Sequence, residues 1–262
     1  MKIIISPAKK MNDREDELDI SGLPCFLSEA EKLKAYIQGL SLEEARALWG
    51  CNEAIARLNY DRFAFMDLKK RLTPALLSYE GIQYQYMAPG VFENRHWEYV
   101  QEHLRILSGF YGILRPLDGI VPYRLEMQAK VKLPDQDGKG GLYQFWGGKL
   151  YHCLMEEEAA AGAGRPLIVN LASKEYSKAI ESCLEPEVDF LTCVFGVLEK
   201  DKKGNSKIKV KATEAKMARG EMVRFMADHQ ITDKELIKSF DGLGYRYREE
   251  FSGKNEYVFI KG

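Results

Sequence analysis

The sequence predicts an α+β fold, in which helices flank a mixed β-sheet within a single domain that spans residues 1–262. Three observations support this prediction. Two short apolar segments, residues 2–5 and 167–171, have the pattern of buried strands. Two pairs of strand-like segments in the C-terminal half are separated by polar turns, as in hairpins. With 262 residues, of which 45% are hydrophobic and 29% charged, the chain has the size and composition of one globular domain.

In the first half of the chain, one strand is predicted to precede a series of helices. Ser6 and Pro7 end the strand at residues 2–5. Residues 28–62 are expected to form two or three helices, because two capping-box patterns begin there, Ser28 with Glu31 and Ser41 with Glu44. Residues 75–79 are predicted as a short strand. Residues 94–107 are predicted as a helix that ends at Ser108 and Gly109, because its apolar residues recur at helical spacing: Trp97, Val100, Leu104 and Leu107.

The second half is predicted to mix short strands with two helices. The expected elements are strands at 122–127 and 142–146 around a polar turn at 135–141, a helix at 149–161, a strand at 167–171, a hairpin of 188–198 with 207–211 that turns at 201–205, a helix from Thr213 to His229, and a closing hairpin of 245–250 with 256–260. Because strands occur in hairpins as well as around helices, a mixed sheet is favoured over a doubly wound parallel one.

The charge of the chain is nearly balanced but unevenly distributed. The formal net charge of −1 argues against a uniformly basic nucleic-acid-binding protein. Residues 200–219, however, carry eight Lys or Arg against two acids, and residues 12–31 carry seven acids against Arg14. The neutral total therefore hides a locally positive surface.

The cysteines and histidines form neither a metal-binding nor a disulfide pattern. The five cysteines include no Cys-x-x-Cys pair, and no histidine lies at ligand spacing from any of them. We therefore expect reduced, mostly buried thiols and no metal or other cofactor. The apolar runs are too short for a membrane span or a secretory signal, so the sequence predicts a cytoplasmic protein without a membrane partner.

Residues 107–127 are the segment with the most functional patterns. Gly109 and Gly112 have nearly the spacing found in the turn of a helix-hairpin-helix element, which is predicted here over residues 94–120. The backbone amides of such a turn can bind phosphate. An ordinary turn between a helix and a loop is the alternative. Arg115 and Asp118 follow directly in the same charged segment.

Further polar residues stand at or near the ends of predicted strands. Arg124 and Glu126 would project from the same face of an extended segment, either as a structural ion pair or as an anion-binding arginine beside an acid–base carboxylate. Lys9 follows the first strand and could bind phosphate, form a Schiff base or lie in a solvated turn. Ser173 is first of all a helix N-cap, because it lacks the flanking glycines of a hydrolase nucleophile.

Basic and aromatic residues add two weaker signals. Lys207, Lys209 and Lys211 share one face of a predicted strand, as either a phosphate-binding stripe or the charged guard of an edge strand. Lys216 and Arg219 share one face of the next helix, apart from its apolar side. Phe145 and Trp146 could stack on an unpaired base, although core packing is the more common use of such residues.

Together these segments resemble one family, the bacterial peroxide stress protein YaaA family. The matching stretches follow the same order over almost the whole chain: residues 5–9 (ISPAK), 103–127 (HLRILSGFYGILRPLDGIVPYRLEM), 142–147 (LYQFWG), 169–176 (VNLASKEY) and 216–220 (KMARG). A nearly continuous match of 25 residues is far more specific than an isolated glycine pattern.

The resemblance implies a compact α+β fold, described for that family as cantaloupe-like, with a helix-hairpin-helix element that maps onto residues 107–112. It also implies binding to DNA, including distorted or partly opened duplex, and a role in limiting iron-driven oxidative damage under peroxide stress. It supplies no settled reaction. By analogy with glycosylases that contain glycine hairpins, Lys9, Asp118 and Glu126 are the candidate catalytic residues.

Two main hypotheses follow. The first is a monomeric DNA-binding stress protein without base-sequence specificity, which contacts phosphates through Arg115, the amides of Gly109 and Gly112, and a cleft lined by Lys9, Arg124, Lys216 and Arg219. The second is an enzyme that acts on a nucleobase, nucleotide or other anionic small molecule in the same cleft, because a surface built only for phosphate needs no Glu126. A third, blander hypothesis is a protein-interaction or iron-handling role, which the scattered histidines support little.

Overall fold

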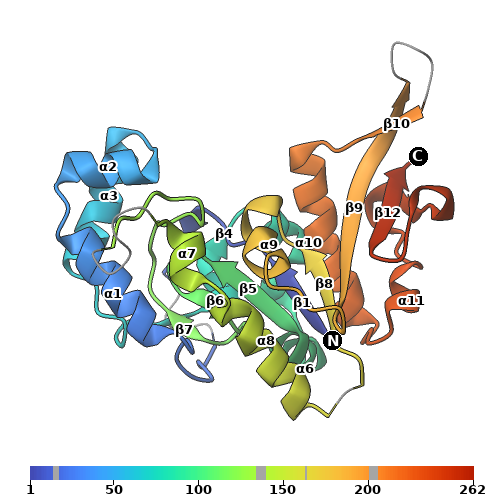
Figure 1. Ribbon diagram of the computed structural model, residues 1–262, viewed down its shortest axis with the longest axis horizontal. Helices are drawn as coiled ribbons and strands as arrows, with labels where there is room; N and C mark the ends of the chain where they lie inside the picture. The colour runs from blue at the N-terminus through green and yellow to red at the C-terminus, as the bar shows by residue number, and fades with distance from the viewer. Residues whose placement is uncertain (14–17, 134–139, 163, 201–205) are drawn as a thin grey trace.

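The computed structural model describes residues 1–13, 18–133, 140–162, 164–200 and 206–262. Within these ranges, an eight-stranded mixed sheet has the order β11-β12-β9-β8-β1-β5-β6, and β10 pairs with β9 outside this path (Figure 1). The predicted α+β class with a mixed sheet is confirmed. The sheet strands are β1 (Lys2–Ile5), β5 (Leu104–Ser108), β6 (Gly112–Leu114), β8 (Leu167–Leu171), β9 (Asp189–Lys200), β10 (Ser206–Lys209), β11 (Tyr245–Tyr247) and β12 (Glu256–Lys261).

Parallel pairing dominates the centre of the sheet. Strand β1 lies between β5 and β8 and is parallel to both, and β9 is parallel to β8 and to β12. The hairpin partners β6, β10 and β11 are antiparallel to their neighbours. Because β1 is covered on both faces, all four of its residues are buried, which explains its unbroken apolar run. The carboxyl ends of β1 and β8 meet at the same edge of the sheet.

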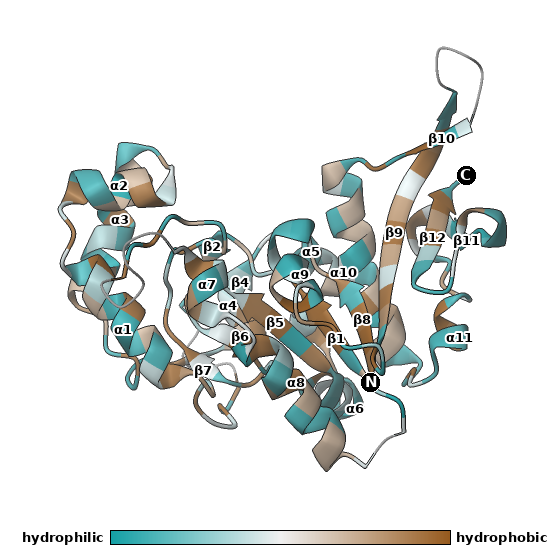
Figure 2. Cartoon of the chain, viewed as in Figure 1, coloured by the Kyte–Doolittle hydropathy of each residue, from teal (hydrophilic) through white to brown (hydrophobic). Residues whose placement is uncertain are grey.

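Helices lie on both sides of the sheet. In Figure 1, α8 and α9 lie in front of the central strands, whereas α6 lies behind them and contacts α10. Figure 2 shows the hydrophobic residues concentrated on the central strands that these helices cover. The α-helices are α1 (Leu27–Gln38), α2 (Leu42–Trp49), α3 (Glu53–Ala64), α4 (Ala75–Ser78), α5 (Ile82–Met87), α6 (Asn94–His103), α7 (Leu142–Trp146), α8 (Lys149–Ala160), α9 (Lys174–Glu181), α10 (Ala212–Asp228) and α11 (Lys234–Ile237).

Smaller elements complete the fold. Two two-stranded sheets pair β2 (Lys10–Met11) with β4 (Tyr79–Glu80), and β3 (Thr73–Pro74) with β7 (Gly119–Ile120). Short 3-10 helices occur at Pro89–Val91, Gly242–Gly244 and Glu249–Phe251. None of the helices in the described ranges combines the length and hydropathy that a membrane span requires.

Helices α5 and α10 pack main chain against main chain at one point. A Cβ atom at Gly220 of α10 would overlap the backbone oxygen of Gln83 in α5. Glycine is therefore required at this position by close approach of the two backbones. Because Gly220 follows Arg219, this contact also places Arg219 beside Gln83.

Most predicted elements are confirmed within a few residues. The strands at 2–5 and 167–171, the helix at 149–161 and both C-terminal hairpins are present. Three helices occupy residues 27–64, and Ser41 with Glu44 forms a capping box. The helix expected from Thr213 to His229 is α10, which begins one residue earlier. The predicted turn at 201–205 and most of the one at 135–141 lie outside the described residues, together with part of both charged segments.

Four local predictions are wrong. Ser28 is not a cap, because it lies inside α1. Residues 75–78 and 142–146 are short helices rather than strands. Residues 122–127 form no strand. Apolar runs of this length fit a buried helical turn as well as a strand, so their pattern does not distinguish the two.

The helix-hairpin-helix prediction is also wrong. Helix α6 ends at His103, and Leu104–Ser108 continues as β5, which forms an antiparallel hairpin with β6. All five residues of β5 are buried, so its apolar residues face both sides of a central strand. Gly109 and Gly112 allow neighbouring groups to pack closely against the main chain. A Cβ at Gly109 would lie 2.5 Å from Leu125 O, and one at Gly112, where φ is +75°, would lie 2.7 Å from the Trp146 ring.

Candidate functional site

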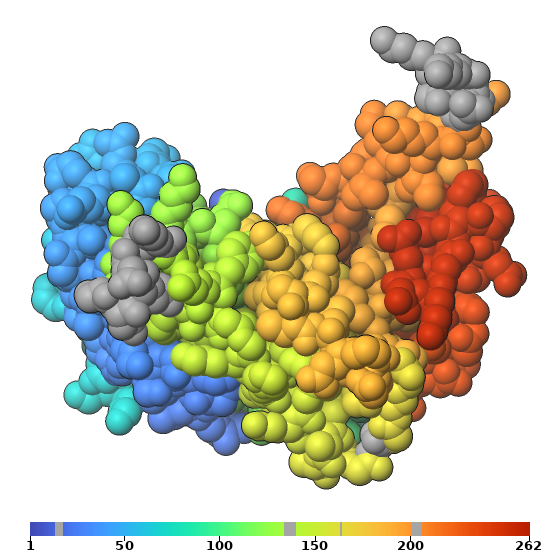
Figure 3. All heavy atoms as spheres, in the orientation of Figure 1, coloured from blue at the N-terminus to red at the C-terminus, as the bar shows by residue number. Residues whose placement is uncertain are grey.

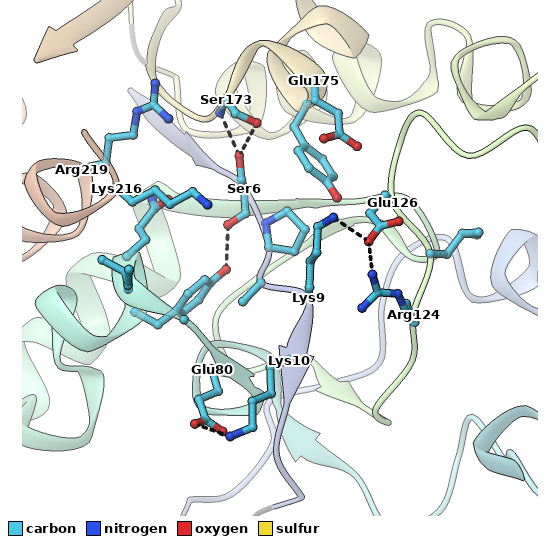
Figure 4. Close-up of a pocket in the computed structure, with 18 of the residues that line it drawn as sticks. Ser6, Lys9, Lys10, Glu80, Arg124, Glu126, Ser173, Glu175, Lys216 and Arg219 are labelled. Carbon is cyan, nitrogen blue, oxygen red and sulfur yellow. Dashed lines mark hydrogen bonds and ion pairs between the residues drawn. The ribbon is translucent and has the colours of Figure 1, made fainter. Parts of the chain in front are cut away.

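A cleft of about 380 Å³ opens at the carboxyl ends of β1 and β8, and we call it the main cleft. Figure 3 shows the molecule hollowed on this side, between the lobe of α1–α3 and the lobe of β9 and α10. Four segments and helix α10 supply the lining: residues 6–10, residues 80–84, residues 123–126, Ser173 with Glu175 and Tyr176, and Lys216 with Arg219. The structure thus brings together Lys9, Arg124, Glu126, Ser173, Lys216 and Arg219, as Figure 4 shows.

Glu126 binds two of the predicted cations on one wall of the main cleft. Its Oε1 lies 3.1 Å from Lys9 Nζ and 3.0 Å from Arg124 Nη2. The side chains of Arg124 and Glu126 are 11% and 14% exposed, whereas that of Lys9 is 69% exposed. Arg124 and Glu126 therefore form an ion pair in the wall of the main cleft. The alternative, an anion-binding arginine beside an acid–base carboxylate, stays a prediction. Lys9 can leave Glu126 at little cost, because an exposed ion pair contributes little free energy.

Hydrogen bonds fix the end of β1 to the start of α9. Ser173 N donates to Ser6 Oγ at 2.8 Å, and Ser6 Oγ donates to Ser173 Oγ at 3.2 Å. The Tyr84 hydroxyl donates to Ser6 O at 2.9 Å. Ser173 occupies the predicted N-cap position of α9, although its side chain caps no amide. The positive end of the α9 dipole therefore opens on the main cleft.

Two buried donors on the opposite wall have no partner. Arg219 Nε and Gln83 Nε2 donate to no acceptor in the part of the chain that the structure describes. Gln83 is 7% exposed, and burial lowers the pKa of Arg219 below its ordinary value. Buried donors in folded proteins are nearly always satisfied by protein, water or ligand, so both groups can still donate to a molecule that enters the cleft. Sequence reasoning missed Gln83, because a single glutamine in a helix carries no pattern.

Carboxylates add acidic groups to the same cleft. Glu80 pairs with Lys10 at 2.7 Å. Burial raises the pKa of Glu175, and the negative charge of Glu126 raises it further, against hydrogen bonds such as that from Gln128 N. A carboxyl group with a raised pKa can donate a proton at a higher pH than an ordinary glutamate. Sequence reasoning missed the role of Glu175, although the residue lies in the matching stretch 169–176.

Buried tyrosines form one side of the main cleft. Burial raises the pKa of Tyr84 and Tyr176 well above the ordinary value and that of Tyr123 to about 12. The Tyr123 hydroxyl lies 2.7 Å from the hydroxyl of Tyr79 and 2.6 Å from Ser108 Oγ. These phenols therefore stay neutral at physiological pH and act as hydrogen-bonding groups.

Arg115 and Asp118 do not line the main cleft. Arg115 Nη2 lies 2.8 Å from Glu157 Oε1, and Arg105 Nε lies 2.7 Å from Glu157 Oε2. Lys2 Nζ is 3.8 Å from the same carboxylate. We call these four residues the Glu157 cluster. Asp118 lies beside it and accepts the Arg115 N–H at 2.8 Å, and burial raises the pKa of Asp118 to about 6.

The amides of the Gly109–Gly112 turn do not face solvent. The N–H groups of Phe110 and Tyr111 donate to Ser108 Oγ at 3.1 and 2.9 Å, and the whole turn is buried. The predicted phosphate contact through Gly109 and Gly112 is therefore wrong. Trp146 is fully buried in the core and donates to Gly109 O, so stacking of a base on it is wrong as well.

The remaining predicted residues lie outside the main cleft. Lys209 pairs with Glu199 and Lys211 with Glu214, on or beside an edge strand that pairs with β9. The cysteines are free, as expected, but only Cys193 is buried, so the prediction of mostly buried thiols is wrong. Among the described residues, no three His, Cys, Asp or Glu side chains gather as a metal site requires.

Comparisons with known proteins give a consistent result. The family model described as peroxide stress protein YaaA matches residues 1–251. A UPF0246 protein of Lachnoclostridium phytofermentans is 53% identical over 262 residues, which cover 100% of this chain and 97% of the relative. UPF0246 proteins of Desulfitobacterium hafniense and Pediococcus pentosaceus are 51% and 49% identical over 261 residues, which cover 100% of this chain and 98% of each relative.

Proposed function

The chain belongs to the peroxide stress protein YaaA family, and from this premise we propose that it serves the peroxide stress response by binding DNA in the main cleft. Binding is without base-sequence specificity and limits iron-driven damage to the bound DNA. The family description supports the stress role, and the charges of the main cleft support the DNA ligand.

One observation carries the DNA proposal. Arg219 is a half-buried cation whose Nε is buried and has no hydrogen-bond partner among the described residues. A buried charge without a partner costs free energy, which an anionic ligand recovers when it binds. Phosphate suits this position, because arginine binds its oxygens through charge-assisted hydrogen bonds. Lys216 lies on the same helix face and adds a second positive charge.

The size of the main cleft favours one form of DNA. A volume of about 380 Å³ suits a small ligand such as a single nucleotide rather than a duplex. A nucleotide can enter such a space only when it is unpaired or turned out of the helix. Partly opened duplex is therefore the preferred ligand, with its phosphates on Arg219, Lys216 and Lys9.

Fluorescence anisotropy tests this function. Labelled duplex, bubble and single-stranded oligonucleotides are titrated with the protein over a salt series. We expect affinity to fall steeply with salt, because cations that contact phosphate displace counterions, and we expect the bubble to bind more tightly than the duplex. Arg219→Met should weaken binding on unrelated sequences alike, whereas Arg115→Met should not, because Arg115 lies in the Glu157 cluster. Equal affinity of wild type and Arg219→Met would contradict the proposal.

A second function, an enzyme that acts on a nucleobase or nucleotide, is favoured by one specific observation. Glu175 has a raised pKa and lines the same cleft as Glu126, so a proton donor and a carboxylate that is paired with two cations can face one ligand. Lys9 is exposed and ion-paired, which favours an electrostatic role over a Schiff base.

Product analysis tests this second function. The protein is incubated with oligonucleotides that contain damaged bases and with free nucleotides, and products are separated by chromatography. We expect turnover that Glu175→Gln abolishes while DNA affinity is retained. The absence of turnover across this panel would remove the enzymatic function and leave the binding function intact.

A further inference from the structure

Outside the main cleft, the sulfur atoms of two cysteines face each other. Cys25 Sγ lies 3.9 Å from Cys153 Sγ, although the two residues are 128 positions apart in the sequence. Cys25 lies in the turn before α1, and Cys153 lies on α8. Cys25 is exposed and Cys153 is half-buried, so a small oxidant can reach the pair from solvent. Neither cysteine belongs to a motif that sequence reasoning identified.

The pair lines a second hollow, of about 440 Å³, beside the Glu157 cluster. Arg105, Arg115, Asp118 and Glu157 line the same hollow. The hydrogen bond from Cys25 lowers the pKa of Cys153, and the positive charge of Arg105 favours the thiolate, against burial and the charges of Glu157 and Glu156. The same hydrogen bond, with burial, raises the pKa of Cys25. Of the two sulfurs, Cys153 is therefore the one that loses its proton more readily, and Cys25 is the one that holds its proton more tightly.

We propose that Cys25 and Cys153 form a dithiol that hydrogen peroxide oxidises to an intramolecular disulfide. A disulfide bond is about 2.05 Å long, so the two sulfurs must approach by about 2 Å. Rotation of the Cys25 side chain, together with a shift of the turn that carries it, can supply this approach. Cys51, Cys183 and Cys193 have no second sulfur within hydrogen-bonding distance among the described residues.

The reaction balances with peroxide as the oxidant. The Cys153 thiolate attacks one peroxide oxygen, an S–O bond forms and the O–O bond breaks, and the hydroxide that leaves takes a proton to become water. Cys153 is then a sulfenic acid. The Cys25 sulfur attacks the Cys153 sulfur, an S–S bond forms and the S–O bond breaks. The hydroxyl group leaves as a second water with the proton of Cys25. Two thiols are oxidised, and one hydrogen peroxide is reduced to two waters.

This redox site is independent of the proposed DNA binding. The two cysteines do not line the main cleft, and Arg219 and Lys216 do not line the hollow that contains the cysteines. A disulfide would join the turn before α1 to α8, and α8 carries Glu157 of the Glu157 cluster. Failure of DNA binding would therefore leave the redox site untouched, and the reverse also holds.

Peptide mapping of the full-length protein tests the proposal. The reduced protein is treated with stoichiometric hydrogen peroxide, and the remaining thiols are then alkylated. We expect the protein to lose two of its five thiols, and the intact mass before alkylation to fall by two hydrogen atoms. A non-reducing digest should contain one peptide that links Cys25 to Cys153. Dithiothreitol should restore both thiols. A digest in which Cys25 and Cys153 remain unlinked while peroxide is consumed would overturn the proposal, as would a link between two chains.

Serine variants establish the order of the two steps. In Cys25→Ser no disulfide can close, so a sulfenic acid should persist on Cys153 and react with dimedone. In Cys153→Ser this adduct should be absent. Cys51→Ser is the matched control and should form the disulfide as wild type does. A dimedone adduct on Cys51 or Cys183 instead of Cys153 would contradict the assigned order.

Discussion

The main cleft and the Glu157 cluster contain the same kinds of side chains and use them in opposite ways. In the cluster, Arg105 and Arg115 each bind one oxygen of Glu157, and Arg105 also donates to two backbone oxygens. In the main cleft, Arg219 is half-buried, and its buried Nε is unpaired among the described residues. An arginine whose donors are paired within the protein stabilises the fold. An arginine with an unpaired donor is available to a ligand.

The largest expected effect concerns Glu157. Glu157→Gln removes the negative charge that holds Arg105, whose side chain is only 4% exposed. Leaving a buried charge unpaired costs about 3 kcal/mol or more of unfolding free energy. Glu126→Gln in the main cleft should cost about 1 kcal/mol, because Lys9, one of the two partners of Glu126, is 69% exposed to water. Guanidinium denaturation measures both. Equal losses would show that ion pairs stabilise the two regions alike.

The next effect is a pH dependence that belongs to Asp118. Its pKa is raised from 3.8 to about 6 in the folded protein, because burial disfavours the charged carboxylate. Between these two values the folded state binds more protons than the unfolded state, so the unfolding free energy falls as pH rises, by about 3 kcal/mol in total.

Asp118→Asn should remove this component, because asparagine carries no titrating proton but still offers an oxygen to the Arg115 N–H. Denaturation curves of both proteins between pH 4 and 7 give the difference. A difference that stays constant across this range would show that the pKa of Asp118 is not raised.

The third prediction exchanges one arginine in each region for methionine, which has similar volume and no charge. Arg219→Met should lower DNA affinity about tenfold, which corresponds to the loss of one charge-assisted contact. Its unfolding free energy should stay equal or rise, because a half-buried charge with an unpaired buried donor is removed.

Arg105→Met should do the opposite, lowering the unfolding free energy while DNA affinity stays unchanged. Anisotropy and denaturation are measured on both variants. Loss of stability in both would mean that Arg219 is as structural as Arg105.

The smallest effect separates two lysines by their salt dependence. Lys216→Ala should reduce the slope of log affinity against log salt by about one, since one phosphate contact is lost. Lys209→Ala should leave the slope unchanged, because Lys209 pairs with Glu199 on the hairpin of β9 and β10. Identical slopes in wild type and Lys216→Ala would place the phosphates elsewhere on the surface.

Sequence patterns predicted the fold best where one pattern fits one element. The apolar run at residues 2–5 and the helix at residues 149–160 are such cases. The pattern failed at residues 104–108, because Leu104 and Leu107 continue the helical spacing of α6 although they belong to a strand buried on both faces. Whether these residues form a helix or a strand depends on contacts with β1, which lies far away in the sequence, and with β6, which follows the turn.

The same limit applies to the candidate site. Lys9 and Ser173 follow buried strands and both line the main cleft where the parallel strands end, as a sequence can indicate. Gln83 and Arg219 became significant only when the packing of α5 against α10 left their donors unpaired. The approach of Cys25 to Cys153 is likewise a product of tertiary structure, because 128 positions separate the two residues.

Gly220 has a consequence for how this protein can change over evolution. Since α10 rests on the main chain of α5 at this glycine, the spacing of the two helices that carry Arg219 and Gln83 is set by backbone atoms rather than by interchangeable side chains. Substitutions among the residues that line the main cleft would alter which ligand is recognised, while the spacing of α5 and α10 stays the same. A residue larger than glycine at position 220 would push α10 away from α5 and widen the spacing of the two helices without altering the lining residues. Ligand chemistry and ligand size are therefore controlled by separate positions and can diverge separately.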